Sequence, residues 1–163
     1  MRICEIARKM IAESGGTAHD TRHFMKVWSY AKIIGELEGL SGKALYTLET
    51  AALVHDIACP LCREKYGSTA GPYQEREGAV LARSFLEECG VPQDVVDRVC
   101  HLVSRHHTFE GVEGEDWRIL LEADFIVNAE ESNYSAEQIR RFRDRVFKTA
   151  SGTMILNALF AID

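Results

Sequence analysis

Apolar residues recur three or four positions apart along most of the chain, which is the spacing of a helix face. The first such segment starts at Ile3 and is ended by the glycine pair at 15–16. Later segments of the same kind predict helices that start near Asp20 or Thr21, after Ser41, near Tyr73, at Pro92, near Trp117, after Ser135 and near Gly152. The stretch from Cys59 to Pro72 lacks this spacing and is predicted to be irregular.

The pattern predicts an all-α fold. No alternation of apolar and polar residues longer than a few positions indicates a strand, and no internal repeat is present. A chain of 163 residues can bury the core of one domain. We therefore expect a single domain of seven or eight short helices over residues 1–163, with its motifs between 17 and 128 and its C-terminal helices from 135 to 163. The segment from Trp117 to Ala129 is apolar on most sides and is expected to be central.

Composition narrows the class of function. Hydrophobic residues make up 46% of the chain and charged residues 27%, with a net charge of −6. This balance argues against an extended nucleic-acid surface or a membrane surface, although a bound cation would still allow a small anionic substrate. No apolar stretch reaches the length of a membrane span, and the first residues do not resemble a signal peptide. The five cysteines are an odd number, so we expect reduced thiols and a cytoplasmic location.

Four residues on three predicted helices carry candidate metal chemistry: His23, the adjacent pair His55-Asp56, and Asp124. Asp124 lies in the apolar sequence ILLEADFIVNA, where a buried carboxylate needs a cation or an arginine partner. Imidazole and carboxylate together suit Fe, Mn, Zn or Ni, and they tolerate Mg. Taken singly, a histidine such as His23 is more often a packed or surface residue, the pair His55-Asp56 is a common dipeptide, and Asp124 could be salt-bridged to an arginine. Their order on separate helices favours one site for a divalent metal.

These residues resemble the H…HD…D signature of the HD-domain superfamily of metal-dependent phosphohydrolases. The resemblance covers about residues 17–128 and includes the segments HDTRHFMKVWSYAKII, AALVHDIA and LLEADFIVNA. It implies an all-α fold, one metal bound by the four residues, and hydrolysis of phosphate esters, often of nucleotides, by metal-activated water that Asp56 orients or deprotonates. The segments HDIACPLCREKYG, GPYQEREG and RHHTFEG resemble a subgroup of small bacterial and archaeal members without an assigned substrate.

The same resemblance raises the question of a second metal. His106 and His107 stand where some relatives have an additional ligand, in a second-metal or a catalytic role. A further histidine expected before a glycine near the start of the 73–88 helix is missing, so Glu75 or Glu77 would have to substitute; otherwise both are solvated or paired with arginines. Some HD nucleotidases have a glutamate three residues after the HD pair. Cys59 stands at that position, which argues against their mechanism and their deoxynucleotide preference.

The residues after the HD pair have alternative interpretations. Cys59 and Cys62 form a C-x-x-C without a second cysteine pair for zinc, so we expect a structural role, and a redox-sensitive disulfide is the alternative. Arg63 and Lys65 could bind a substrate phosphate or be surface charges. The basic run from Arg140 to Lys148 is expected to be a solvated helix face, with an oligomer contact or a nucleotide-tail contact as alternatives.

Two classes of function remain open. The first is a metal-dependent phosphohydrolase acting on a small phosphate ester, with a nucleotide or a related metabolite as the expected substrate. The second is a nucleotide- or metal-binding sensor or partner module with little turnover, which the missing glutamate and the missing histidine favour. A di-iron oxygenase is a more remote alternative. The apolar C-terminal helix could also support a homodimer.

Overall fold

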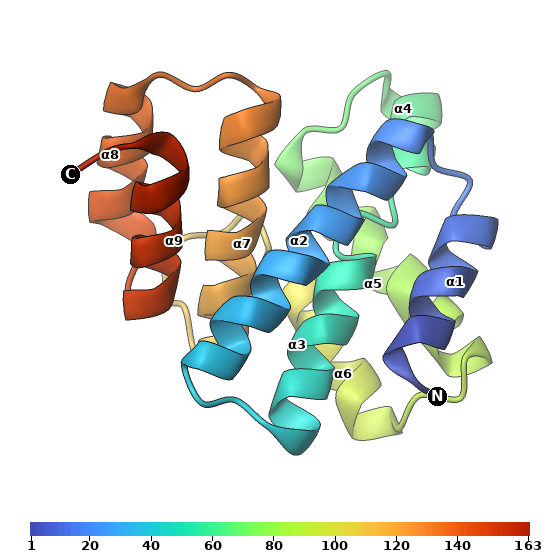
Figure 1. Cartoon of the computed structure of the whole chain (residues 1–163). Coiled ribbons are helices and arrows are strands. Elements are labelled where there is room, and N and C mark those ends of the chain that lie inside the picture. The colour runs from blue at the N-terminus through green and yellow to red at the C-terminus, as the bar shows by residue number, and fades with distance from the viewer.

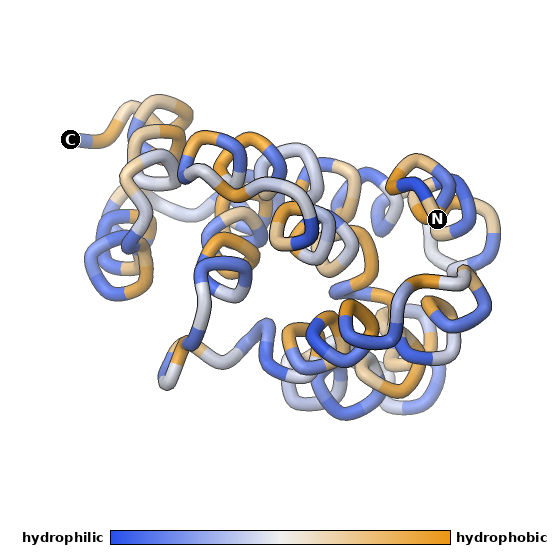
Figure 2. The backbone as a smooth tube through the Cα atoms, turned by 90° about the horizontal axis from the view of Figure 1, so that it is seen from below, coloured by the Kyte–Doolittle hydropathy of each residue, from blue (hydrophilic) through white to orange (hydrophobic).

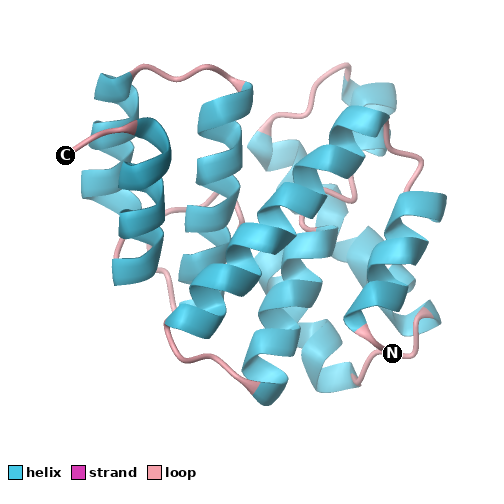
Figure 3. Cartoon of the chain, viewed as in Figure 1, coloured by secondary structure: helices cyan, strands magenta, loops and turns pink.

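The apolar helix faces converge on a core of 37 buried residues in the computed structural model, which describes residues 1–163. All regular structure is helical (Figure 3), which confirms the all-α prediction. The nine helices are α1 (Ile3–Glu13), α2 (Ala18–Leu37), α3 (Gly42–Val54), α4 (Cys59–Tyr66), α5 (Gly71–Glu88), α6 (Gln93–Val103), α7 (Glu115–Glu131), α8 (Ala136–Val146) and α9 (Ala150–Phe160). None of them is long and apolar enough to span a bilayer.

Helices α2, α3 and α7 form the centre of the domain. α2 packs against both α3 and α7. Eleven residues of α7 are buried, from Trp117 at its first turn to Ala129 near its end, as its continuous apolar sequence predicts. Helices α8 and α9 cover one flank, whereas α1, α4, α5 and α6 lie on the other side of α2 and α3 (Figure 1). Seen end-on, polar segments follow the outside of the bundle (Figure 2).

Two helix starts show how the sequence sets the element boundaries. The hydroxyl of Ser135 accepts a hydrogen bond from the Gln138 backbone N–H at the start of α8, which confirms the predicted cap. The predicted start of α2 near Asp20 or Thr21 is three or four residues too late. Thr17 is the cap, and Asp20 completes a capping box by accepting a hydrogen bond from the Thr17 backbone N–H at 2.7 Å.

The prediction of an irregular stretch between Cys59 and Pro72 is wrong for its first half. Residues 59–66 form α4, and Pro60 lies in its first turn, where a missing backbone N–H costs no hydrogen bond. Gly67 ends the helix with a φ of 63°, a left-handed conformation that glycine adopts without strain. α4 therefore determines the directions in which the side chains of Arg63 and Lys65 point.

Substitution of a buried valine should lower the free energy of unfolding, whereas the same substitution on the surface should not. Val99→Ala in α6 removes two methyl groups from a fully buried position and should lower the free energy of unfolding by about 2 kcal/mol. Val80→Ala in α5, where the side chain is 71% exposed, should change it by less than about 0.5 kcal/mol. Urea denaturation would measure both. Equal effects would contradict the placement of the core.

Candidate functional site

Four side chains from the central helices meet at the end of α3. His23 comes from α2, His55 and Asp56 follow α3, and Asp124 comes from α7. Nε2 of His23 lies 3.1 Å from Oδ1 of Asp124 and 3.4 Å from Oδ2 of Asp56. Nε2 of His55 lies 3.3 Å from Nε2 of His23 and 3.4 Å from Oδ1 of Asp124. The structure therefore brings together all four residues of the H…HD…D pattern.

A hydrogen bond at the opposite ring nitrogen fixes the orientation of each central imidazole. Nδ1 of His23 lies 2.9 Å from Oε2 of Glu131, and Nδ1 of His55 lies 2.8 Å from the carbonyl oxygen of Ala52. A carbonyl or carboxylate oxygen can only accept, so Nδ1 carries a proton and Nε2 is the nitrogen that faces the cluster. Metal-binding histidines typically have such a partner on their second nitrogen.

The cluster concentrates electron pairs where water cannot screen them. Lone pairs of two imidazoles face two carboxylates in a largely buried space, an arrangement that is stable only with a cation or protons among them. Burial lowers the pKa of His23, but its hydrogen bond to Asp124 and the charge of Asp56 outweigh that effect and raise it to about 10. Burial alone would raise the pKa of both aspartates, yet the neighbouring histidines hold each of them below its usual value. The ligand types and their arrangement fit a divalent metal.

His106 and His107 extend the cluster on the side of Asp56. Nε2 of His106 lies 3.3 Å from Oδ1 of Asp56, while its Nδ1 donates to the carbonyl oxygen of Val103 at 2.7 Å. Asp56, His106 and His107 form a second group of close metal-ligand atoms, and Asp56 belongs to both groups. Nε2 of His107 is buried without a hydrogen-bond partner, and the contact of His106 Nε2 with Asp56 lacks hydrogen-bond geometry. Unpaired buried nitrogens of this kind need a ligand.

The start of α5 packs tightly against His107. A β-carbon at Gly71 would lie 2.9 Å from the His107 ring, so only glycine allows this approach. Burial and the neighbouring His106 lower the pKa of His107 to about 4, so its imidazole is neutral near pH 7. Glu75 accepts hydrogen bonds at 3.0 Å from the His107 backbone N–H and from the Thr108 hydroxyl. Glu75 therefore holds the backbone at His107 and Thr108 in position.

Of the other charged residues proposed from the sequence, Arg63 lies at the site, whereas Lys65 and Glu77 do not. Lys65 and Glu77 form an ion pair at 3.0 Å, and the Tyr66 hydroxyl donates to the same Glu77 carboxylate. Neither residue lines the cavity that opens over the cluster of His23, His55, Asp56 and Asp124. Lys65 on α4 and Glu77 on α5 therefore face each other outside the cavity, which matches the alternative that they are paired charges and not the alternative that they contribute to the site. Arg63 does line the cavity and binds Asp20 through two guanidinium nitrogens at 3.1 and 2.5 Å.

A cavity of about 320 Å³ opens over the cluster. Sequence reasoning missed several of its polar side chains. Asn128 follows Asp124 by one helical turn and donates to its Oδ1 at 2.9 Å, a relation that the four-residue spacing could have revealed. Gln74 is the α5 side chain that faces the cavity, at a position next to the glutamates considered from the sequence. The remaining missed residues are His19, Asp20, Thr69 and Glu131.

Cys59 of the C-x-x-C pair borders the cavity, and neither cysteine joins a metal-ligand group. Cys59 and Cys62 are buried free thiols on α4. The Cys59 thiol donates to Oε1 of Gln74 at 3.4 Å, and burial together with the charge of Asp56 raises its pKa far above the usual value. A thiol with a raised pKa is a poor nucleophile. This environment supports the structural interpretation of the pair.

Comparison with known proteins agrees with this arrangement. Curated proteins give no match. A predicted HD superfamily hydrolase from an uncultured Thermotogales bacterium is similar in fold, with a TM-score of 0.68 and 24% identity over 98% of this chain and 83% of that one. The Lin1889 protein from Listeria innocua has a TM-score of 0.61 and 17% identity over 99% of this chain and 91% of its own. The sequence profile of the HD domain matches residues 21–146, and the chain therefore belongs to the HD domain family.

Proposed function

We propose that the protein is a metal-dependent hydrolase of small phosphate esters. The observation that carries the proposal is the convergence of His23, His55, Asp56 and Asp124, with imidazole lone pairs and carboxylates aimed at one point. These four residues would hold a divalent ion of Fe, Mn, Zn, Ni or Mg. A bound divalent ion lowers the pKa of water and polarises a phosphoryl oxygen. The hydrolase named among the structurally similar proteins is consistent with this chemistry.

Each surrounding residue then has a distinct task. Asp56 reaches the second group formed with His106 and His107, so its carboxylate is the one placed to orient or accept a proton from an attacking water. His107 has a pKa of about 4 and suits the role of ligand or hydrogen-bond acceptor better than that of a general acid. Glu131 and the Ala52 carbonyl keep Nε2 of His23 and His55 available.

Arg63 is the cavity side chain that we assign to the substrate phosphate. A guanidinium matches two phosphate oxygens, and its present bidentate contact with Asp20 shows the geometry it can offer. The cavity volume of about 320 Å³ suits a small ester, and a nucleotide or a related phosphorylated metabolite is the substrate class that we propose. Measured hydrolysis of the bound ester would distinguish this function from that of a sensor module, which would bind the same ligand with little turnover.

Metal binding should depend on pH with a defined sign. In the metal-free protein His23 holds a proton up to a pKa of about 10, and a metal must displace it. Affinity for Mn²⁺ or Zn²⁺ should therefore rise about tenfold per pH unit between about pH 6 and pH 8. Titration calorimetry on chelator-treated protein would measure this slope. Asp124→Asn should weaken binding throughout, whereas His101→Gln, an exposed histidine, should not; a pH-independent affinity would contradict the proposed ligand set.

Loss of the shared carboxylate should abolish turnover. Asp56→Asn should lower phosphate release from a panel of phosphate esters, with each candidate metal, by about a hundredfold or more. Asp97→Asn, the same change at an exposed position on α6, is the matched control and should leave the rate unaltered. If a demonstrated hydrolytic activity survives Asp56→Asn, the proposed centre is not its source. Metal binding without any phosphate release would instead favour the sensor module.

Arg63 and Lys65 should respond differently to substitution. Arg63→Lys keeps the charge but removes the bidentate geometry, and it should raise KM for the ester about tenfold with a smaller change in kcat. Lys65→Ala should change neither constant, because its ammonium pairs with Glu77 outside the cavity. Steady-state kinetics would test both variants. A larger effect at Lys65 than at Arg63 would overturn the assignment.

A further inference from the structure

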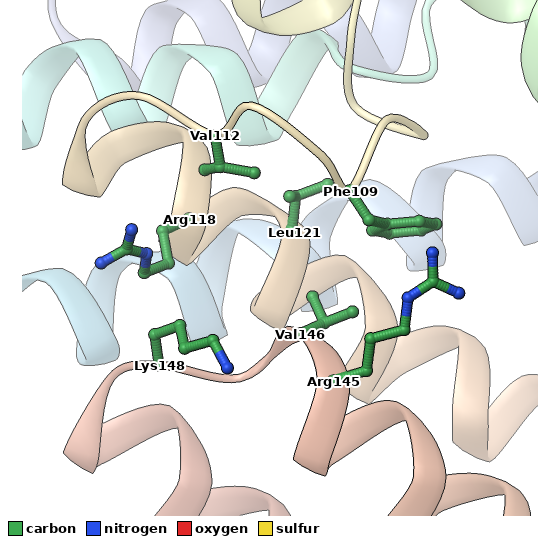
Figure 4. Close-up of a pocket in the computed structure, with 7 residues that line it drawn as sticks. All are labelled: Phe109, Val112, Arg118, Leu121, Arg145, Val146 and Lys148. Carbon is green, nitrogen blue, oxygen red and sulfur yellow. The ribbon is translucent and has the colours of Figure 1, made fainter.

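A second pocket gathers three cations between α7, α8 and the segment that joins α8 to α9. Its volume is about 200 Å³, and Arg118, Arg145 and Lys148 line it around a floor formed by Val112, Leu121 and Val146. In Figure 4, Arg118 and Lys148 stand on one side of this floor and Arg145 stands on the other, beside Phe109. Three separate segments thus contribute one positive charge each to the same space.

Two of these three cations lack the carboxylate partner that most other basic residues of this acidic chain have, and the third has a weak one. Neither Arg118 nor Lys148 forms an ion pair, in contrast to Arg98 on α6, which binds Asp116 in the first turn of α7. Arg145 has only a 3.9 Å contact with Glu110, whose side chain is 91% exposed. Three like charges at one pocket repel one another, so an anion between them would lower the energy.

The nearest buried acid, Glu122, forms no ion pair with the pocket cations, although burial raises its pKa and the charge of Arg118 acts in the opposite direction. The Glu122 carboxylate accepts hydrogen bonds from the backbone N–H groups of Lys148 and Thr149 at 2.7 and 3.0 Å, and also from the Thr149 hydroxyl. These contacts occupy the carboxylate on the side of the linker. They also fix the backbone of Lys148 and hence the position from which its ammonium reaches the pocket. The cationic site is therefore held in place by a buried interaction.

The pocket lies along α7 from the metal-site cluster. Arg118, Leu121 and Asp124 follow one another at three-residue spacing, so the Cα atoms of Arg118 and Asp124 lie about 9 Å apart along the helix axis and about 120° apart around it, with Leu121 between them. A third cavity of about 300 Å³ lies between the two, since it shares Asp124 and Asn128 with the metal site and Leu121 with the cationic pocket. Its other walls are mainly aromatic: Phe109, Phe125, Tyr134 and Phe142.

We propose that Arg118, Arg145 and Lys148 form a site for the phosphate or carboxylate group of a small molecule. Guanidinium and ammonium groups are the side chains that recognise such anions. The aromatic cavity that shares residues with both sites favours the far end of the substrate as the source, with its apolar or planar body against the aromatic side chains, and this part of the inference rests on the proposed function. An independent anionic effector would use the same chemistry. The basic run at 140–148 is then partly a binding element.

The site itself is tested without metal and without turnover. Binding of inorganic phosphate to chelator-treated protein at constant ionic strength would be followed by calorimetry. The double variant Arg118→Ala, Lys148→Ala should bind at least about tenfold more weakly than the wild type. The control Arg140→Ala, Arg141→Ala removes the same charge from the exposed face of α8 and should bind normally. No binding by the wild type, or equal binding by the two double variants, would overturn the proposal.

A second experiment distinguishes the two sources of the anion. Alkane bisphosphonates of increasing length would be titrated into metal-loaded protein beside the matching monophosphonates. If the pocket holds the far end of the substrate, one bisphosphonate of the series should bind at least about tenfold more tightly than its matching monophosphonate, and the pocket variant should lose this gain. If no length gives a gain while inorganic phosphate still binds the pocket, the site serves a separate effector. Because the phosphate titration needs no metal, its result can be interpreted even if the hydrolase proposal fails.

Discussion

The repulsion among the imidazole nitrogens and carboxylate oxygens at the end of α3 is the constraint on which the arrangement of the central helices depends. His23, His55 and Asp124 come from three different helices, yet their ligand atoms lie within 3.4 Å of one another. Without a positive charge among them the three helices would be pushed apart. In the metal-free protein a proton on His23 supplies that charge, as its pKa of about 10 indicates. Cation binding and helix packing are therefore coupled.

Helix ends provide the rigidity that this site needs. α3 ends at Val54 and α6 ends at Val103, and the histidines follow within three residues of these ends. The last carbonyl groups of a helix have no intrahelical partner, so the imidazole Nδ1 groups of His55 and His106 can donate to them, three residues back in each case. The same bond satisfies a helix end and fixes which ring nitrogen faces the cluster. Two unrelated helices thus position their histidines by one device.

The sequence predicted those features whose cause is local. Helical spacing gave the all-α class, the central α7 and the cap at Ser135, and the ordered histidines and aspartates indicated one cluster. It missed α4, because eight residues with a proline in the first turn carry too little periodicity. The contact of His23 with Glu131 joins positions 108 residues apart and depends on how α2 crosses α7. The outward direction of Lys65 likewise follows from α4, which the pattern did not reveal.

The distribution of charge along α7 bears on how an anion could approach an acidic protein. A net charge of −6 repels anions at long range, so binding requires local positive potential. Near Asp124 and Asn128 that potential would come from a metal and from Arg63; two turns earlier it comes from Arg118 with Arg145 and Lys148. Between them the cavity has mainly aromatic walls and no lysine or arginine. A molecule with anionic groups at both ends and an apolar middle would match this order, whereas a single small anion would use only one end.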